Sequence, residues 1–161
     1  MHKKEEFFQN IKENEGIIYK VARLYADSAE DQKDVYQEIV YQLWKSYPSF
    51  KKNSKISTWM YRVALNTAIS NLKKEKRKGI QVPIDNSLLN RMAEIDKVME
   101  ERITLLYAHI KKLSIVEKGI ILLHLEGKNY DEIAAITGFT ATNIGTRLTR
   151  IKNKLKSRIK K

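Results

Sequence analysis

The sequence predicts an all-α protein of two small helical domains, the C-terminal one built around a helix-turn-helix. Apolar residues recur at spacings of three and four along most of the chain, as amphipathic helices require. Its only two prolines, Pro48 and Pro83, fall between these periodic stretches. The stretch around Pro83 also loses the positive charge of the residues before it. We therefore expect domains at residues 1–79 and 91–161, joined by a linker at 80–90.

The N-terminal domain is expected to open with one or two amphipathic helices, broken near Gly16, that contribute mainly core. Ser28 is the expected N-cap of the next helix, with Asp31 at its third position, and Pro48 prevents this helix from continuing past Ser46. The polar face of that helix carries five residues at helical spacing: Asp34, Gln37, Glu38, Tyr41 and Lys45. Periodicity alone does not distinguish a solvated face from a protein-docking face.

A basic loop, residues 48–57, leads into a helix expected to begin near Thr58. At about 100° per residue, six of the residues that follow share one ridge. The ridge offers an aromatic ring, an amide and three cations: Trp59, Arg62, Asn66, Ser70, Lys73 and Arg77. Cations track phosphates and exposed aromatic or amide groups hold unstacked bases, which favours a surface for single-stranded nucleic acid. A structural role stays open, because the sequence does not show which way Trp59 points.

The C-terminal domain is expected to contain about four helices. Apolar residues spaced from Leu88 to Leu113 predict a long first helix. Ser114 and Glu117 form a Ser-x-x-Glu capping box for the second helix, which is expected to end at Gly127. The helix-turn-helix follows these two helices.

Residues 129–161 carry the signals of a helix-turn-helix. Asn129 and Glu132 open its first helix, Gly138 suits the left-handed turn that ends it, and Thr140 caps the second helix. The second helix has one apolar stripe: Ile144, Leu148, Ile151, Leu155 and Ile159. Every charged residue from Thr140 onward is basic, which favours DNA docking over a merely solvated helix.

The charge of the chain indicates an anionic partner. The 31 Lys and Arg residues outnumber the 19 Asp and Glu residues, giving a net charge of +12. Residues 51–79 alone carry 9 basic and 1 acidic side chains, and residues 113–161 carry 10 and 4. Nucleic acid and a membrane surface both fit this total. Two basic zones separated by a neutral stretch favour two nucleic-acid contacts joined by a spacer.

Other features of the composition indicate a cytoplasmic protein. The chain has no Cys, which removes disulfides and thiolate metal sites and fits a reducing compartment. No stretch approaches the roughly 18 uninterrupted apolar residues of a membrane span, and residues 1–8 lack the apolar run of a signal peptide. We therefore expect no membrane insertion.

No pattern in the sequence predicts catalysis. His2, His109 and His124 have no Cys or close carboxylate partners at metal-ligand spacing. There is no Ser-His-Asp order and no glycine loop for a phosphate. Adjacent carboxylates at 30–31 and 131–132 fit helix starts better than an acid/base pair. We expect neither an enzyme nor a bound metal or cofactor.

Three segments in order resemble a known family. They are DVYQEIVYQLW at 34–44, STWMYRVALN at 57–66, and the stretch from Leu113 to Leu155 that contains the helix-turn-helix. Together they resemble the extracytoplasmic-function group of the sigma-70 family, the small alternative sigma factors of bacterial RNA polymerase. The resemblance covers nearly the whole chain, and three ordered motifs are far more specific than a lone helix-turn-helix.

The resemblance implies a role for each segment. The first would bind core RNA polymerase through Asp34, Gln37, Glu38 and Tyr41. The basic loop and the ridge would capture a base of the melted −10 strand, with Asn66 at a matching recognition position. The last helix would read the −35 duplex, with six candidate residues for the contact: Thr142, Asn143, Thr146, Arg147, Thr149 and Arg150. Among these types, Arg pairs bidentately with guanine and Asn with adenine.

The implied function is that of a non-enzymatic specificity subunit, an alternative sigma factor that directs polymerase to promoters and helps open the −10 region. Its implied partners are core polymerase, duplex and single-stranded promoter DNA, and an anti-sigma factor. At Gly145 the sequence departs from the family, whose recognition helices usually carry Lys or Arg there. The alternative function, a stand-alone helix-turn-helix transcription regulator, leaves the first eighty residues unexplained.

Overall fold

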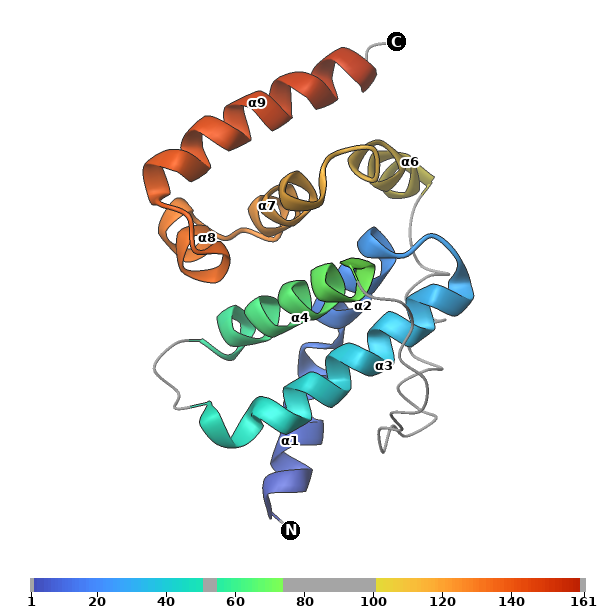
Figure 1. Cartoon of the computed structure of the whole chain (residues 1–161), viewed down its shortest axis with the longest axis vertical. Helices are drawn as coiled ribbons and strands as arrows, with labels where there is room; N and C mark the ends of the chain where they lie inside the picture. Colours follow the sequence, from blue (N-terminus) through green and yellow to red (C-terminus); the bar gives the residue numbers. More distant parts are fainter. Residues whose placement is uncertain (1, 51–54, 74–100, 160–161) are drawn as a thin grey trace. The chain divides into compact units, whose positions relative to one another are not determined.

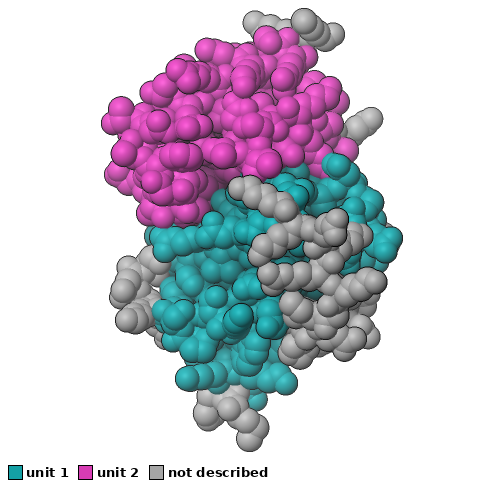
Figure 2. Space-filling model, in the orientation of Figure 1, with its two compact units in different colours: residues 1–98 teal, residues 99–161 magenta. Residues whose placement is uncertain are grey.

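The computed structural model describes residues 2–50, 55–73 and 101–159. Regular structure within these ranges is entirely helical, with no strand among them (Figure 1). The chain divides into two compact units, Met1–Val98 and Met99–Lys161 (Figure 2). The predicted all-α architecture of two helical domains is therefore confirmed. The expected linker at 80–90 lies outside the described residues, so the domain limits stay a prediction.

The first unit is a small helical bundle. Its elements are α1 (His2–Glu13), α2 (Glu15–Tyr25), α3 (Ala29–Ser46), a 3₁₀ turn η1 (Tyr47–Ser49) and α4 (Ile56–Lys73). Helices α2, α3 and α4 pack against one another. Their contact surfaces supply the side chains that are fully excluded from solvent: Ile18, Val21, Ala22, Ile39, Val40, Leu43, Met60, Ala64 and Ala68.

Most helix caps and helix ends in this unit lie where the sequence predicts them. The Ser28 hydroxyl accepts a hydrogen bond from the Asp31 backbone N–H at 3.0 Å, and the helix it caps ends at Ser46 as predicted. The break expected near Gly16 falls at Asn14. Helix α4 begins at Ile56 rather than near Thr58, because the first turn is already closed by a bond from the Trp59 N–H to the residue 55 carbonyl.

The second unit contains four described helices, as predicted. They are α6 (Glu101–Ile110), α7 (Ile115–Leu125), α8 (Tyr130–Thr137) and α9 (Ala141–Ile159). Helix α9 packs on each of the other three (Figure 1). The long first helix was expected to reach Leu113, but α6 ends at Ile110 in a turn. The expected start of that helix lies outside the described residues.

The caps of this unit are the predicted ones. Ser114 and Glu117 form a reciprocal capping box at the start of α7, with bonds of 3.2 and 3.1 Å. Asn129 and Glu132 form a second box at the start of α8, with bonds of 2.8 and 3.0 Å. Gly138 ends α8 at φ +87°, a conformation that side chains with a Cβ rarely adopt. These signals set the sharp turn between α8 and α9.

Candidate nucleic-acid interfaces

Helix α9 presents one face to its own unit and the other to solvent. The Thr140 hydroxyl caps it by accepting from the Asn143 N–H at 3.1 Å. Four members of the predicted apolar stripe are buried, namely Ile144, Leu148, Ile151 and Leu155. The fifth, Ile159, is 52% exposed, so the packed part of the stripe ends one turn earlier than expected.

The six residues predicted to read the −35 duplex lie on or beside the solvent face of α9. Five are exposed and Arg147 is half-buried; the exposed ones are Thr142, Asn143, Thr146, Thr149 and Arg150. The hydroxyls of Thr146 and Thr149 donate to backbone carbonyls one turn earlier, at 3.3 and 3.1 Å. A continuous accessible face therefore exists, and its contact with DNA stays a prediction.

Arg147 is held in place by two neighbours. Its Nε donates to the Asn143 Oδ1 at 2.6 Å, and its guanidinium carbon lies 4.4 Å from the centre of the Phe139 ring. A cation over an aromatic face is a favourable contact. The sequence carried a signal for the first of these contacts, because residues four apart on a helix are neighbours. From the sequence, Asn143 and Arg147 are nevertheless predicted as two separate candidates for contact with the −35 duplex.

Gly145, where the sequence departs from the family, lies against an aromatic ring. A Cβ built on Gly145 would be 3.2 Å from the Tyr130 Cε2 atom, closer than ordinary van der Waals contact. Tyr130 is the first residue of α8 and remains 44% exposed. The flank of α9 that carries a cation in the family is thus covered by Tyr130, a residue that the sequence did not single out.

The basic C-terminal half of α9 is tied to the start of α7. The Lys154 Nζ donates to the Glu117 Oε2 at 2.8 Å, so Glu117 serves both the capping box and this ion pair. Burial alone would raise the pKa of Glu117, but the bonds from Lys154 and Ser114 outweigh it and hold that pKa below its usual value. The pair joins the basic half of α9 to the first turn of α7.

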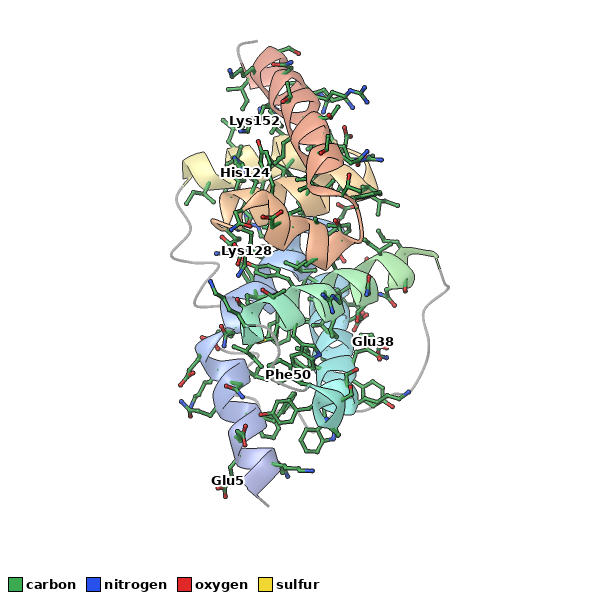
Figure 3. All side chains as sticks on the ribbon, turned by 90° about the vertical axis from the view of Figure 1, so that its left-hand side faces the viewer. Glu5, Glu38, Phe50, His124, Lys128 and Lys152 are labelled. Carbon is green, nitrogen blue, oxygen red and sulfur yellow. The ribbon has the colours of Figure 1, made fainter. Side chains whose placement is uncertain are left out.

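A second, electrostatic interaction between these helices involves a histidine. Burial, and then the positive charge of Lys152, lower the pKa of His124 below its usual value. Figure 3 labels both residues, one on α7 and the other on α9. His124 is half-buried, and the charge of Lys152 further disfavours its protonation.

In the first unit, the predicted −10 ridge of α4 is only partly described. Arg62, Asn66 and Ser70 are exposed on one side of the helix. Arg77 and the side chain of Lys73 lie outside the described residues. Trp59 differs from the exposed members, because it is half-buried and stacks on Phe50 with ring centres 4.9 Å apart. Single-strand binding by the ridge stays a prediction.

Phe50 and Trp59 belong to a set of rings that we call the aromatic cluster: Phe7, Phe8, Trp44, Tyr47, Phe50 and Trp59. The Tyr47 hydroxyl donates to Glu6 at 2.8 Å and accepts from Asn10 at 3.0 Å, which ties α1 to η1. Figure 3 labels Phe50, the last described residue before residues 51–54. Trp59 lies in the first turn of α4, so the Phe50–Trp59 stack joins the end of η1 to the start of α4. Non-local contacts of this kind left no signal in the sequence.

The predicted polymerase-binding face lies on α3, away from its buried stripe. Asp34 is exposed, and Gln37, Glu38 and Tyr41 are half-buried. Figure 3 shows Glu38 pointing away from the helices that α3 packs on. Its Oε1 accepts a hydrogen bond from the Gln42 Nε2 at 3.2 Å. The face is accessible, and its binding to polymerase stays a prediction.

Two features are absent from the described part of the chain. No helix there has the length and apolar content needed to cross a membrane. No three His, Asp or Glu side chains among those residues gather closely enough to hold a metal ion.

Comparisons with known proteins match both units. The family model of sigma-70 region 2 matches residues 11–78, and that of sigma-70 region 4 matches residues 103–155. RNA polymerase sigma factor SigV of Bacillus subtilis is 28% identical over 134 residues, which are 83% of this chain and 78% of SigV. The ECF RNA polymerase sigma-E factor of Escherichia coli is also 28% identical, over 88% of this chain and 81% of its own.

Solved structures show the same fold. The sigma factor RpoE of Bartonella quintana, solved with the anti-sigma factor NepR, superposes with a TM-score of 0.74 at 17% identity, over 97% of this chain and 98% of its own. CnrH, solved with the cytosolic domain of CnrY, superposes with a TM-score of 0.68 at 18% identity, over 98% of this chain and 89% of its own. The two family regions occur in order and together cover most of the chain. The chain therefore belongs to the sigma-70 family of RNA polymerase sigma factors, within its extracytoplasmic-function group.

Proposed function

We propose that this chain is an alternative sigma factor that binds core RNA polymerase, directs it to specific promoters and helps open the −10 region. The observation that carries this proposal is the presence of both sigma-70 regions, in order, on two separate helical units. The second unit anchors the −35 duplex through α9. The first unit binds polymerase through the polar face of α3 and holds an opened strand on α4.

Opening in this scheme uses binding energy alone. Unstacking a base costs a few kcal/mol. Contacts of the basic residues to phosphates, and of a captured base to the region around Asn66, offset that cost once the strand has melted. The protein acts without a cofactor or chemistry of its own, in the cytoplasm with the polymerase.

The test is transcription by reconstituted polymerase. Core RNA polymerase is mixed with this protein and a pool of random DNA, and the bound and transcribed sequences are recovered. We expect a motif with two conserved elements and transcripts that start at a fixed distance downstream. Core polymerase alone is the negative control, and core with a known sigma factor is the positive control. If only the positive control gives specific transcripts, the proposal fails.

The alternative function predicts a different result. A stand-alone regulator would enrich a duplex motif without core polymerase and would not co-purify with that enzyme. A sigma factor is expected to co-elute with core polymerase in gel filtration. Gel filtration of Asp34→Lys and Glu38→Lys variants with core polymerase tests the predicted docking face. The reversed charges should weaken the complex. Helix α3 should still fold, because both positions are at least partly accessible.

An anti-sigma factor is the proposed regulatory partner. The RpoE structure that resembles this chain contains one, the anti-sigma factor NepR. We expect a partner purified with this protein to compete with core polymerase for it. A partner that binds at the same time as core polymerase would not be an anti-sigma factor of this kind.

A further inference from the structure

Asn143 and Arg147 form one unit on the exposed face of α9. The bond from the Arg147 Nε to the Asn143 Oδ1 is 2.6 Å long, slightly shorter than the roughly 2.7–2.9 Å usual for charge-assisted N–H···O bonds. Phe139 supports the guanidinium from its face, at 4.4 Å. The arginine is therefore held from two directions before any DNA arrives.

The donors and acceptors that are already hydrogen-bonded in this pair indicate different roles for Asn143 and Arg147. Reading adenine would need the Asn143 Oδ1 to accept from the adenine N6 amino group while Nδ2 donates to N7. That oxygen is already bound to a guanidinium, whose donor hydrogens would face the amino donor of adenine. In contrast, no acceptor among the described residues takes the hydrogens of the Arg147 Nη1 and Nη2 atoms.

We propose that Arg147 is the specificity-determining residue for one guanine of the −35 duplex, and that Asn143 is its positioning residue and reads no base itself. The inference rests on the proposed function and assigns partners within that site. The two terminal nitrogens of Arg147 form an edge of paired donors, which matches the O6 and N7 acceptors of guanine.

The place of the pair on α9 favours a base edge over a phosphate. Asn143 and Arg147 are the third and seventh residues of a helix that begins at Ala141. In helix-turn-helix proteins, the N-terminal residues of the recognition helix contact base edges. A phosphate contact would also use the paired donors, but it would carry no preference for one base pair over another.

The experiment measures base discrimination position by position. The full chain is bound to the duplex enriched by selection with core polymerase, and to copies in which each guanine is replaced in turn by adenine or by 7-deazaguanine, which lacks the N7 acceptor. For one guanine, wild-type protein should lose between about fivefold and about 150-fold in affinity on replacement by adenine. Arg147→Lys keeps the charge but not the paired donors. At that guanine alone, it should bind the guanine and adenine duplexes with nearly equal affinity.

The Asn143 variants identify its role. Asn143→Ala should reduce discrimination at the same guanine as Arg147→Lys, and the double variant should be no worse than Arg147→Lys alone. Asn143→Asp is the matched control, because its carboxylate keeps an acceptor for Nε but has no amide donor. It should therefore retain the guanine preference even where overall affinity falls. Helix content and the thermal midpoint of each variant check folding.

Several results would overturn the inference. Relaxation at an adenine position by Asn143→Ala would make Asn143 a reader in its own right. An unchanged ratio at every guanine in Arg147→Lys would show that the paired donors of Arg147 do not set the guanine preference. In both cases the proposed function survives, because wild-type protein still enriches its motif. Failure of wild-type protein to enrich any motif would overturn the proposed function and this inference together.

Discussion

At the scale of single residues, α9 contains an interior glycine, Gly145, that lies against an aromatic ring. A glycine inside a helix costs about 0.5–1 kcal/mol relative to alanine. Tyr130 packs on the open side of Gly145, and as a residue it is 44% exposed, so we expect its ring to be able to move outward. The ring contact thus offsets part of the cost that the glycine imposes.

We expect Gly145→Ala to raise the free energy of unfolding of the protein by about 0.5 kcal/mol, the propensity gain less the cost of displacing Tyr130. Urea denaturation followed by circular dichroism measures this change. In a Tyr130→Ala background the same substitution should give the larger gain expected of an uncovered helix position. A net loss of stability in the wild-type background would show that the ring is fixed rather than displaceable.

His124 predicts a pH dependence near neutrality. Its pKa in the folded state lies below the ordinary value of 6.5, through burial first and the charge of Lys152 second. Below pH 6.5 the unfolded chain therefore binds more protons than the folded one, and this group lowers stability as the pH falls. We expect His124→Gln to lose less stability than wild type between pH 7.5 and pH 5.5.

Urea denaturation at the two pH values measures that difference. Lys152→Gln is the informative companion variant, because it removes the second cause and leaves burial in place. Its loss of stability on acidification should fall between those of wild type and His124→Gln. Equal losses in all three proteins would contradict an effect of His124.

At the scale of elements, the sequence predicted the helix caps but not the side-chain contacts between separate elements. Ser28, Ser114, Asn129 and Thr140 could be placed as caps because each bonds a backbone N–H three residues away. The Phe50 stack on Trp59 crosses a loop, so no periodicity could reveal it. The sequence therefore predicted the helical fold and its caps. It could not predict the contacts that hold Trp59 and Arg147 in place, because they depend on the folded structure.

The Glu117–Lys154 ion pair joins α7 to α9 and should contribute a small coupling free energy. The Lys154 side chain is 51% exposed and that of Glu117 is 15% exposed, so solvent screens the pair. We expect a coupling free energy of about 0.5 kcal/mol in a double-mutant cycle of Glu117→Gln and Lys154→Met at pH 7. A coupling indistinguishable from zero at low ionic strength would mean that the ion pair contributes nothing.

The same pair should fail in acid. The pKa of Glu117 is lowered in the folded state from its ordinary 4.5, so the stability it contributes is present above that value. It is lost as the pH falls below 4.5 and through the folded-state pKa. Repeating the cycle at about pH 3 should therefore give a smaller coupling than at pH 7. A coupling that persists undiminished would assign it to packing of the Lys154 stem.

At the scale of the whole molecule, the proposed function divides promoter recognition between the two units. The exposed Arg150 lies on α9 of the second unit, whereas the exposed Asn66 lies on α4 of the first. The proposed function assigns duplex anchoring to the former and strand capture to the latter. Because the two contacts form at different steps, substitutions in the two units should affect different measurements.

We expect Arg150→Ala to weaken binding of the holoenzyme to promoter duplex by between about fivefold and about 150-fold if it contacts a base. If it contacts a phosphate instead, the slope of log affinity against log salt concentration should become shallower by about 0.9. The fraction of bound promoter that opens should stay near that of wild type. Fluorescence anisotropy on labelled duplex measures binding, and permanganate reactivity of unpaired thymines measures opening.

Asn66→Ala should have the reverse effect, with little change in duplex affinity and a marked loss of permanganate reactivity at the −10 element. Its side chain is exposed on α4, so the substitution leaves the packing of the first unit intact. A premelted promoter gives the decisive control: if Asn66 binds a captured base, the variant should still bind this template less well than wild type. Equal impairment of duplex binding and opening by both variants would contradict the division, since a single binding step would then involve both units.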